Sequence, residues 1–381
     1  MRALQNAVAI SAIAFLTSAA GLGCEGVGEA DTGPDADTDT DTDADTDADT
    51  DADSDADTDA DTDADTDADG DGGVIEMDCT DCPAVGSTLS NMLCAIDMCD
   101  MDVVVQNEYV SLSPLETCTL EDTYEAVERF GSPTNALAPL KNESYAIMAS
   151  GIATGSVHSG SCTSYSTPAE DPYSTEGYST YDPFEWRLAF VAPEEAKGFR
   201  FKYVFFSEEY DDYIAGSVND KFYVILEAGS TDGGTPKVIN FTSCRDPEGY
   251  YDFICAPEDS GCEEGERYCY VAVNSALSEC CWYPFGSVFA PNPGDPPCPD
   301  GTWTTDIGGT GFECASAVSD DSQAKGSSTG WLQTSWPITG GEMFALTFHI
   351  HDTSDGIFDS EVILDSFEFT KDADQGTVPI E

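Results

Sequence analysis

Two stretches decide the fold: FRFKYVFFSEEYDDYIAGSVNDKFYVIL at residues 199–226 and FALTFHIHDTSDGIFDSEVILDSFEF at residues 344–369. Each begins with large apolar residues that alternate with smaller or polar ones, passes through an acidic segment and continues as a second β-rich run. A period of two is typical of a strand that buries one face. Each stretch therefore predicts a strand, an acidic turn and a second strand.

The rest of the chain after residue 74 is also rich in short apolar runs. Residues 268–273 (YCYVAV) form another β-rich run, and the loops between such runs are rich in Gly, Pro, Asp and Ser. The one helix that we expect is short, at residues 121–130. Many short strands separated by loops predict a mainly β fold, a β-sandwich or jelly roll with long disulfide-stapled loops.

The composition restricts the partners. The chain has 381 residues, with 74 Asp and Glu against 13 Lys and Arg, and a formal net charge of −61. This charge argues against nucleic acid as a partner, because nucleic-acid binders need basic residues that neutralise phosphate. It also argues against a basic patch that docks on anionic lipid. Fifteen cysteines are typical of an exported protein.

The N-terminus predicts export and lipidation. Residues 1–23 have the form of a signal peptide, with Arg2 followed by an apolar run of ten residues, AVAISAIAFL, too short to span a membrane. Cys24 follows Gly23, as in a bacterial lipobox, although Gly21 stands where that motif usually has Leu. Lipidation of Cys24 would leave 14 cysteines, an even number. The alternative is cleavage near residues 18–20, with Cys24 kept in the mature chain.

Residues 24–73 predict a lipid-anchored, disordered tether. Asp occupies every odd position from 35 to 71, and the intervening residues are almost all Ala and Thr. Such a segment has nothing to bury and repels itself, so we expect it to be extended. Its 41 residues from 31 to 71 would reach at most roughly 140 Å. We expect a spacer that holds a domain away from a membrane, and the alternative is an inert low-complexity run.

The remaining cysteines predict disulfides. A Cys-rich segment at residues 74–119 contains Cys79 and Cys82, whose spacing also suits a redox pair or half of a zinc site. In an exported chain without a second such pair, disulfides are favoured. Eight further cysteines lie between residues 244 and 314, in or beside a Pro-rich region, and the adjacent Cys280 and Cys281 are expected to have separate partners.

Several short motifs together resemble the choice-of-anchor L domain of bacterial exported and surface-attached proteins. They are SEEY at 207–210, GS at 216–217, ND at 219–220 and DSEV at 359–362, with FGSPTNALAP and ASG between residues 130 and 151. The resemblance covers residues 120–371 and leaves a tail at 372–381. It implies a β-rich extracytoplasmic module with a variable anchor, here the lipid, and it implies no reaction.

The acidic turns predict a calcium site. Glu208, Asn219 and Asp220 belong to one turn, and Asp359 and Glu361 to the other. Ca²⁺ prefers six to eight oxygen ligands. These five residues are our first choices because they coincide with the resemblance, and further acids stand beside them: Glu209, Asp211, Asp212, Asp352, Asp355 and Asp365. We expect the turns to meet in space, and the alternative is a solvated acidic face.

Residues of the same region also suit two other kinds of functional site. Glu208 or Glu209 with Glu361 would give the two carboxyl groups of a glycoside hydrolase. His349 and His351, followed by Asp352, have the spacing of a Zn²⁺ or Cu²⁺ site, weighed against partly exposed strand residues without a third ligand. No GxSxG motif occurs and the remaining histidine is His158, so we expect no catalytic residues.

The sequence therefore predicts a binding or adhesion lipoprotein of the bacterial cell envelope, presented from the outer membrane, with structural Ca²⁺ in its acidic turns. Its expected partners are the membrane, through the lipid, and an extracellular glycan or protein. The alternatives are an envelope hydrolase that acts on glycans and a purely structural envelope protein.

Overall fold

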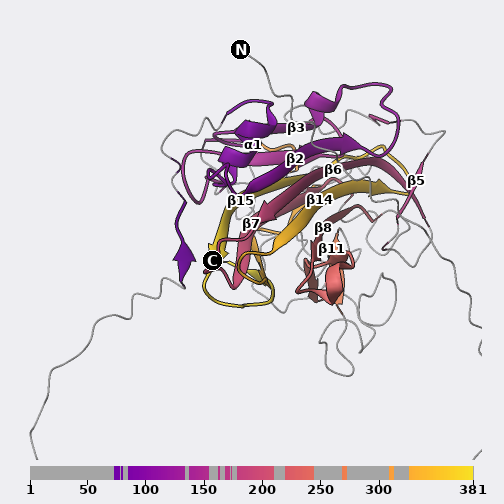
Figure 1. Ribbon diagram of the computed structural model, residues 1–381. Coiled ribbons are helices and arrows are strands. Elements are labelled where there is room, and N and C mark those ends of the chain that lie inside the picture. The colour runs from indigo at the N-terminus through magenta and orange to yellow at the C-terminus, as the bar shows by residue number, and fades with distance from the viewer. Residues whose placement is uncertain are drawn as a thin grey trace, which may run out of the picture. The chain divides into compact units, whose positions relative to one another are not determined.

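The structure, a computed structural model, describes residues 73–77, 79, 85–133, 137–153, 162–163, 168–171, 173, 178–209, 219–243, 268–272, 309–312 and 326–380. The expected signal peptide, Cys24 and nearly all of the tether lie outside the described residues, as do residues 210–218 of the first acidic turn. The described part is a sandwich of two antiparallel sheets (Figure 1). The predicted mainly β fold is confirmed.

Sheet A has a path of six strands in the order β16-β13-β7-β15-β4-β3, with β1 paired to β15 and β12 paired to β7. Its strands are β1 (Val74–Ile75), β3 (Tyr124–Val127), β4 (Tyr145–Ala149), β7 (Gly198–Ser207), β12 (Ser327–Ser328), β13 (Leu332–Pro337), β15 (Ser360–Thr370) and β16 (Gly376–Pro379). The two predicted strands β7 and β15, which are far apart in the sequence, are neighbours at the centre of this sheet.

Sheet B has the order β10-β11-β8-β14-β6-β2, with β5 paired to β6 and β9 paired to β8. Its strands are β2 (Val104–Ser111), β5 (Ala169–Glu170), β6 (Ser179–Val191), β8 (Lys221–Ala228), β9 (Lys237–Val238), β10 (Phe241–Ser243), β11 (Tyr268–Ala272) and β14 (Met343–Thr353). Each acidic turn therefore passes from one sheet to the other, β7 to β8 and β14 to β15.

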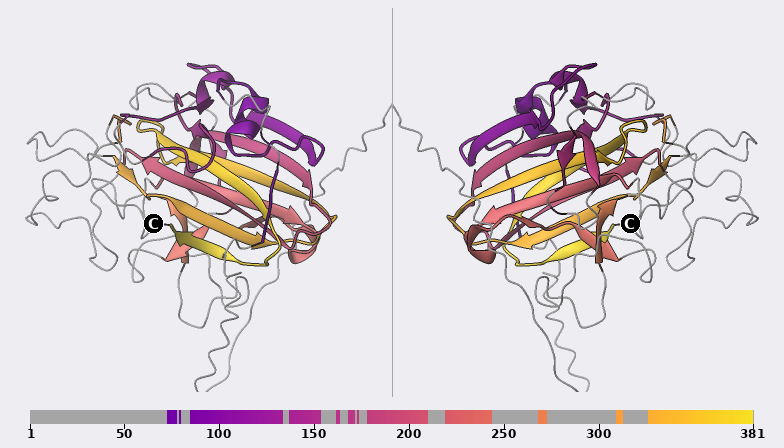
Figure 2. Two further views of the ribbon diagram at one scale, coloured as in Figure 1. Left: turned by 90° about the vertical axis from the view of Figure 1, so that its left-hand side faces the viewer. Right: turned by 90° about the vertical axis from the view of Figure 1, so that its right-hand side faces the viewer.

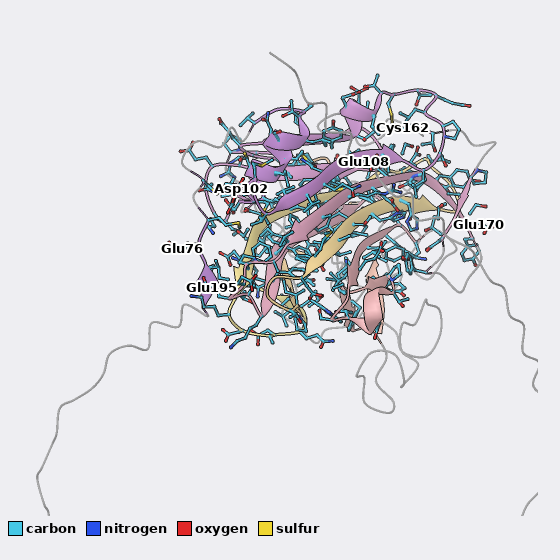
Figure 3. The ribbon with its side chains drawn as sticks, in the orientation of Figure 1. Glu76, Asp102, Glu108, Cys162, Glu170 and Glu195 are labelled. Carbon is cyan, nitrogen blue, oxygen red and sulfur yellow. A yellow bond between two sulfur atoms is a disulfide. The ribbon has the colours of Figure 1, made fainter. Side chains whose placement is uncertain are left out.

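Side chains fill the space between the sheets (Figure 3), and the buried residues of this core are rich in aromatic rings. From β7, Phe199, Phe201 and Tyr203 point into it, and Phe344 and Phe348 of β14 meet them from the opposite sheet. The rings of Phe199 and Phe344 stack with centroids 5.3 Å apart. Burying a large apolar side chain contributes about 1.5–3 kcal/mol, so this alternating pattern holds the sheets together.

The outer face of sheet A is covered as well. Val204 and Phe206 of β7 and Ile363 of β15 point away from sheet B and pack in a second cluster with Phe130 and Phe312. The central strands of sheet A are therefore buried on both faces, which is why β15 is buried at every position.

One α-helix occurs among the described residues, α1 (Leu89–Ala95), together with the 3₁₀ turns η1 (Leu120–Thr123) and η2 (Asp232–Gly234). The Thr88 side chain caps α1 by accepting a hydrogen bond from the Asn91 backbone N–H at 3.2 Å. The helix contacts β2, β3 and β4 and lies with these N-terminal segments along one side of the sandwich (Figure 2). No described helix has the length and apolar character that crossing a membrane requires.

The helix expected at residues 121–130 is wrong. The chain makes only η1 there and then extends as β3, which pairs with β4 from Tyr124 opposite Met148 to Val127 opposite Tyr145. Tyr124 and Ala126 alternate into the core, so tertiary pairing at a sheet edge overrides the local preference.

Segments outside residues 120–371 also belong to the sandwich. In the Cys-rich segment 74–119, β1 pairs with β15 and β2 pairs with β6. In the tail 372–381, β16 pairs with β13.

Candidate functional site

The two acidic turns meet at one end of the sandwich. The Asp220 carboxylate accepts hydrogen bonds from the Thr353 backbone N–H at 3.0 Å and from the Ser360 hydroxyl at 2.7 Å. The Thr353 hydroxyl donates to the Asn219 carbonyl at 2.9 Å. The Glu208 backbone N–H lies 3.4 Å from the Asp359 carbonyl. The expectation that residues 219–220 and 359–361 come together is confirmed.

Strand register places the acids of this end on two faces of sheet A. Ser207 lies opposite Ser360, and Glu361 lies opposite both Phe206 and Ala149. Because side chains alternate along a strand, Glu361 points to the outer face with Phe206, whereas the Ser360 hydroxyl points inward to Asp220. Glu208, Asp359 and Glu361 form an outer acid set, and Glu209, Asp220 and Asp352 form an inner acid set.

All six carboxyl groups are buried, each residue being 2 % exposed or less. None of the ion pairs between described residues includes Glu209, Asp352 or Glu361. Lys221, which follows Asp220, directs its ammonium to Asp171 instead, at 3.3 Å. Burying a charge without a partner is very costly, so the arrangement needs a proton or a cation at these groups.

Burial raises the pKa of every one of these groups for which a shift is resolved. The pKa of Glu208 rises to about 9, first through burial and then through the charge of Asp359. Burial raises the pKa of Asp220 to about 7 despite the hydrogen bonds from Ser360 and Thr353. The pKa values of Glu209, Asp352 and Glu361 also lie well above their ordinary range, through burial and then neighbouring carboxylates. Without a cation, the site takes up protons at neutral pH.

Several oxygens in the two sets are buried and make no hydrogen bond to a described residue. They are Oε2 of Glu361, Oε2 of Glu209 and both carboxylate oxygens of Asp352. Buried polar atoms in native proteins nearly always have a partner, so these oxygens indicate a missing one.

The predicted ligands are thus gathered, but a metal site is not formed as it stands. Among the described residues, no group of three or more His, Cys, Asp or Glu side chains is arranged to hold a metal ion. The donors are carboxylates, carbonyls and hydroxyls, which suit a hard cation such as Ca²⁺. The other acids that the sequence placed beside the turns have different positions. Asp355 lies close enough to Glu209 for its charge to act on that group, whereas Asp365 lies away from the site, beside Leu140. Asp211 and Asp212 lie outside the described residues.

A second polar cluster lies on the outer face of sheet B. Nδ1 of His349 is 3.1 Å from Oε1 of Glu185, and its Nε2 is 2.8 Å from Nδ1 of His351. Nε2 of His351 is 3.5 Å from Asp171, which also accepts a hydrogen bond from the Tyr223 hydroxyl at 2.6 Å. Burial lowers the pKa of His351 to about 4, so this imidazole is neutral at pH 7.

The interpretation of both histidines as partly exposed is wrong, because His349 is 5 % and His351 0 % exposed. The segment at Asp171 and the ring of Tyr223 cover them. Asp171 and Glu185 are not predicted by the sequence, because neither residue stands in a distinguishing motif.

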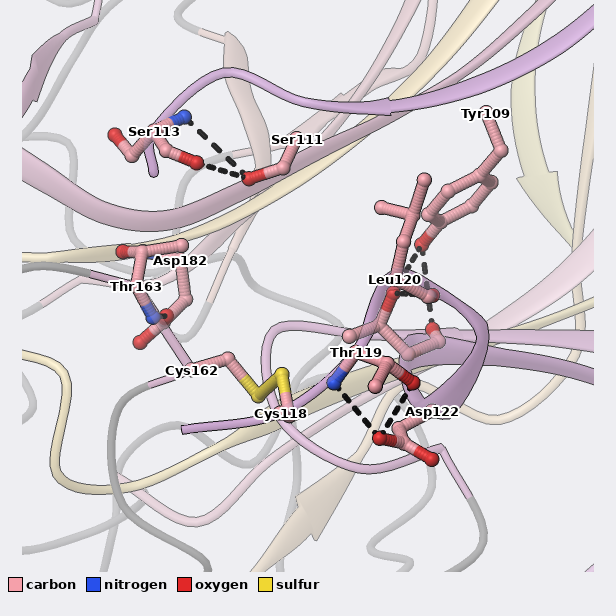
Figure 4. The surroundings of a disulfide bond; sticks show 11 residues. Tyr109, Ser111, Ser113, Cys118, Thr119, Leu120, Asp122, Cys162, Thr163 and Asp182 are labelled. Carbon is pink, nitrogen blue, oxygen red and sulfur yellow. Dashed lines mark hydrogen bonds between the residues drawn. A yellow bond between two sulfur atoms is a disulfide. The ribbon is translucent and has the colours of Figure 1, made fainter. Parts of the chain in front are cut away.

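Cysteines of the N-terminal segment form disulfides. Cys79 pairs with Cys99 and not with Cys82, and Cys118 pairs with Cys162. Figure 4 shows the second bond beside Thr163, whose backbone N–H donates to Asp182 at 2.5 Å. Cys94 is also disulfide-bonded. The preference for disulfides over a redox or zinc CxxC is therefore confirmed for Cys79. Of the eight cysteines at residues 244–314, Cys269 belongs to β11 and the other seven lie outside the described residues.

Comparisons with known proteins add little. No protein-family model matches the sequence, and no curated protein matches it. Among solved structures, the chain is similar to TmCBM61 in complex with β-1,4-galactotriose, with 8 % identity, a TM-score of 0.26, and coverage of 70 % of this chain and 90 % of that one. A likeness at this score does not assign a ligand.

Proposed function

We propose that this chain is a calcium-stabilised binding module, exported and displayed from the bacterial cell envelope. The observation that carries the proposal is the buried pair of acid sets where β7, β8, β14 and β15 meet. Carboxylates at this depth repel one another, and a divalent cation would remove that repulsion and fix the turns that join the two sheets.

The chemistry of the donors favours calcium over other common metals. Asp220 and Glu361 are typical of the oxygen donors that Ca²⁺ takes in variable number, at 2.3–2.6 Å. Zinc prefers sulfur and nitrogen, and the histidines His349 and His351 belong to the separate cluster on sheet B. Extracellular modules bind Ca²⁺ with Kd values of about 10⁻⁴–10⁻³ M, which suits an exported protein.

Display from the envelope is supported by the sequence and the disulfides. Residues 1–24 resemble a lipoprotein signal, and the alternating Asp tether follows. The bonds Cys79–Cys99 and Cys118–Cys162 suit an oxidising compartment. The choice-of-anchor L resemblance points the same way and stays a prediction.

Binding is a better proposal than hydrolysis. A glycoside hydrolase must admit a sugar between its two carboxyl groups. Glu208, Glu209 and Glu361 are all buried, which leaves no room for a sugar to reach them. This arrangement suits a cation that holds the loops, with an extracellular glycan or protein bound elsewhere on the module.

The proposal is tested by thermal unfolding of the mature chain after treatment with a chelator. Adding Ca²⁺ at 100 times its Kd should stabilise the folded state by about 2.7 kcal/mol and raise Tm. Glu361→Gln should reduce the shift, whereas Glu195→Gln, at an exposed acid, should leave it unchanged. An equal Tm with and without Ca²⁺ would remove the metal from the proposal.

The binding role has its own test. The calcium-loaded protein and the chelator-treated protein are compared in glycan and protein binding screens. We expect a ligand that is retained with Ca²⁺ and lost when the turns are freed by chelation. Binding that is unaffected by chelation would separate the two parts of the proposal.

A further inference from the structure

We infer that this end of the sandwich holds two divalent cations, one in each acid set, on opposite faces of sheet A. The inference rests on the proposed function and deepens it, because it assigns separate ligands to each ion. It concerns a hard, calcium-like cation at both positions.

The outer set is brought together by adjacent strands. With Ser207 opposite Ser360, Glu208 lies across from Asp359, and Glu361 lies two residues further along the same face of β15. Residues directly opposite on antiparallel strands have Cβ atoms about 4.5–5.5 Å apart. Three carboxylates therefore project from neighbouring positions of one face.

Gly151 makes room for this set. Gly151 follows the end of β4 by two residues. Because Ala149 lies opposite Glu361, Gly151 lies opposite Asp359, two residues before Glu361. A Cβ atom at Gly151 would overlap the Asp359 carboxyl group. The missing side chain lets that carboxylate lie against the backbone. Oε2 of Glu361, fully buried nearby, makes no hydrogen bond to a described residue and is available to a cation.

The inner set is built differently. Asp220 is fixed between the sheets by the Thr353 N–H and the Ser360 hydroxyl. Glu209 lies just past the end of β7 and beside Asp220, and its backbone N–H donates to the Ser207 hydroxyl at 3.2 Å. Asp352 lies at the end of β14 with both oxygens buried and without a hydrogen bond to a described residue.

One ion cannot serve both sets. Glu361 and Ser360 are consecutive residues that point to opposite faces of β15, and the backbone of the sheet lies between their side chains. A calcium ligand lies only 2.3–2.6 Å from the ion.

The experiment counts bound Ca²⁺ on the mature chain by native mass spectrometry and calorimetry, after chelator treatment and in excess Mg²⁺ to suppress weak binding by the tether. We expect two bound Ca²⁺ per chain at saturating Ca²⁺. Glu361→Gln should lose one and keep the other, and Glu209→Gln should do the same. The double variant should bind none, and Glu195→Gln should keep both.

Asp359→Asn and Asp352→Asn provide a second variant for each set, and near-UV circular dichroism identifies any variant that fails to fold. One Ca²⁺ in the wild type, lost equally in outer-set and inner-set variants that fold, would overturn the two-ion inference and leave the proposed function intact. No bound Ca²⁺ in the wild type would overturn both.

Discussion

At the scale of single residues, Gly151 shows how closely the acid cluster is packed. We expect Gly151→Ala to destabilise the protein by about 1–3 kcal/mol, because its Cβ would displace the Asp359 carboxylate. The measurement is urea unfolding with and without Ca²⁺. Gly229→Ala is the matched control, since its nearest neighbour is Glu342 Oε2 at 3.6 Å, and it should change stability by less than about 1 kcal/mol. Equal effects of the two substitutions would contradict the close packing.

The buried carboxyl group of Asp365, which is outside both acid sets, makes the stability of the fold depend on pH. Burial, and further the charge of Asp97, raises its pKa to about 7, although the Leu140 N–H donates to it at 2.7 Å. The folded state therefore holds a proton that the unfolded chain releases near pH 4, and the contribution of Asp365 to stability falls as the pH rises from about 4 to 7.

Asp365→Asn keeps an acceptor for Leu140 and removes this titration. Relative to wild type, the variant should gain about 2 kcal/mol between pH 5 and pH 8. Urea unfolding at both pH values in saturating Ca²⁺ measures the gain, with Glu128→Gln as an exposed control. The same difference from wild type at both pH values would show that Asp365 does not titrate as described.

The scale of elements shows what sequence could and could not predict. Strands β7 and β14 alternate cleanly because one face of each meets the core, so their period of two is visible in the sequence. β4 is buried at all five positions and has no alternation to detect. β6 contains Pro183 next to Asp182, whose φ is 48°, and pairs across an irregular register, so its sequence resembles a loop.

Only some residues of the candidate site could be predicted from the sequence. Glu208, Asp359 and Glu361 of the outer set, and Asp220 of the inner set, stand in short motifs at strand ends that the sequence shows. Asp352 stands in no such motif, and its burial depends on β14 lying between β6 and β8. No local pattern could show that Lys221 would turn away from Asp220 to pair with Asp171.

That ion pair attaches the segment of β5 to β8. Lys221 and Asp171 have side chains 1 % and 3 % exposed, and their charges are 3.3 Å apart. Lys221→Met should destabilise the fold by about 3–5 kcal/mol, because it leaves a buried carboxylate without its ammonium partner. The double variant Lys221→Met with Asp171→Leu should recover part of this loss in urea unfolding. Additive effects would show that the two charges are not coupled.

The disulfide Cys118–Cys162 links residues 44 positions apart. Replacing both cysteines with Ala should lower the free energy of unfolding by about 2–4 kcal/mol, since the unfolded chain gains conformational freedom. Unfolding of the variant in urea is compared with wild type under non-reducing conditions. An unchanged midpoint would mean that the surrounding contacts already constrain this loop.

At the scale of the whole molecule, the proposed lipid at Cys24 sets where the protein is found. Cys24→Ser should move it from the membrane fraction to the soluble fraction, as judged by fractionation and immunoblotting. Shortening residues 31–71 while keeping Cys24 should leave it membrane-bound. Retention of the Cys24→Ser protein on membranes would contradict the lipid anchor.

The way the chain enters the sandwich has a mechanical consequence. β1 pairs with β15 at two positions, Val74 with Thr370 and Ile75 with Phe369, and Ile75 also packs against the core. A pull on the chain before Gly73 would act on this short pairing first. The peeling would reach Cys79, whose bond to Cys99 transfers the load to the covalent backbone beyond α1. If the chain is anchored through Cys24 as proposed, a pulling force would therefore extend the junction before Cys79, while the disulfide keeps α1 out of the path of the load.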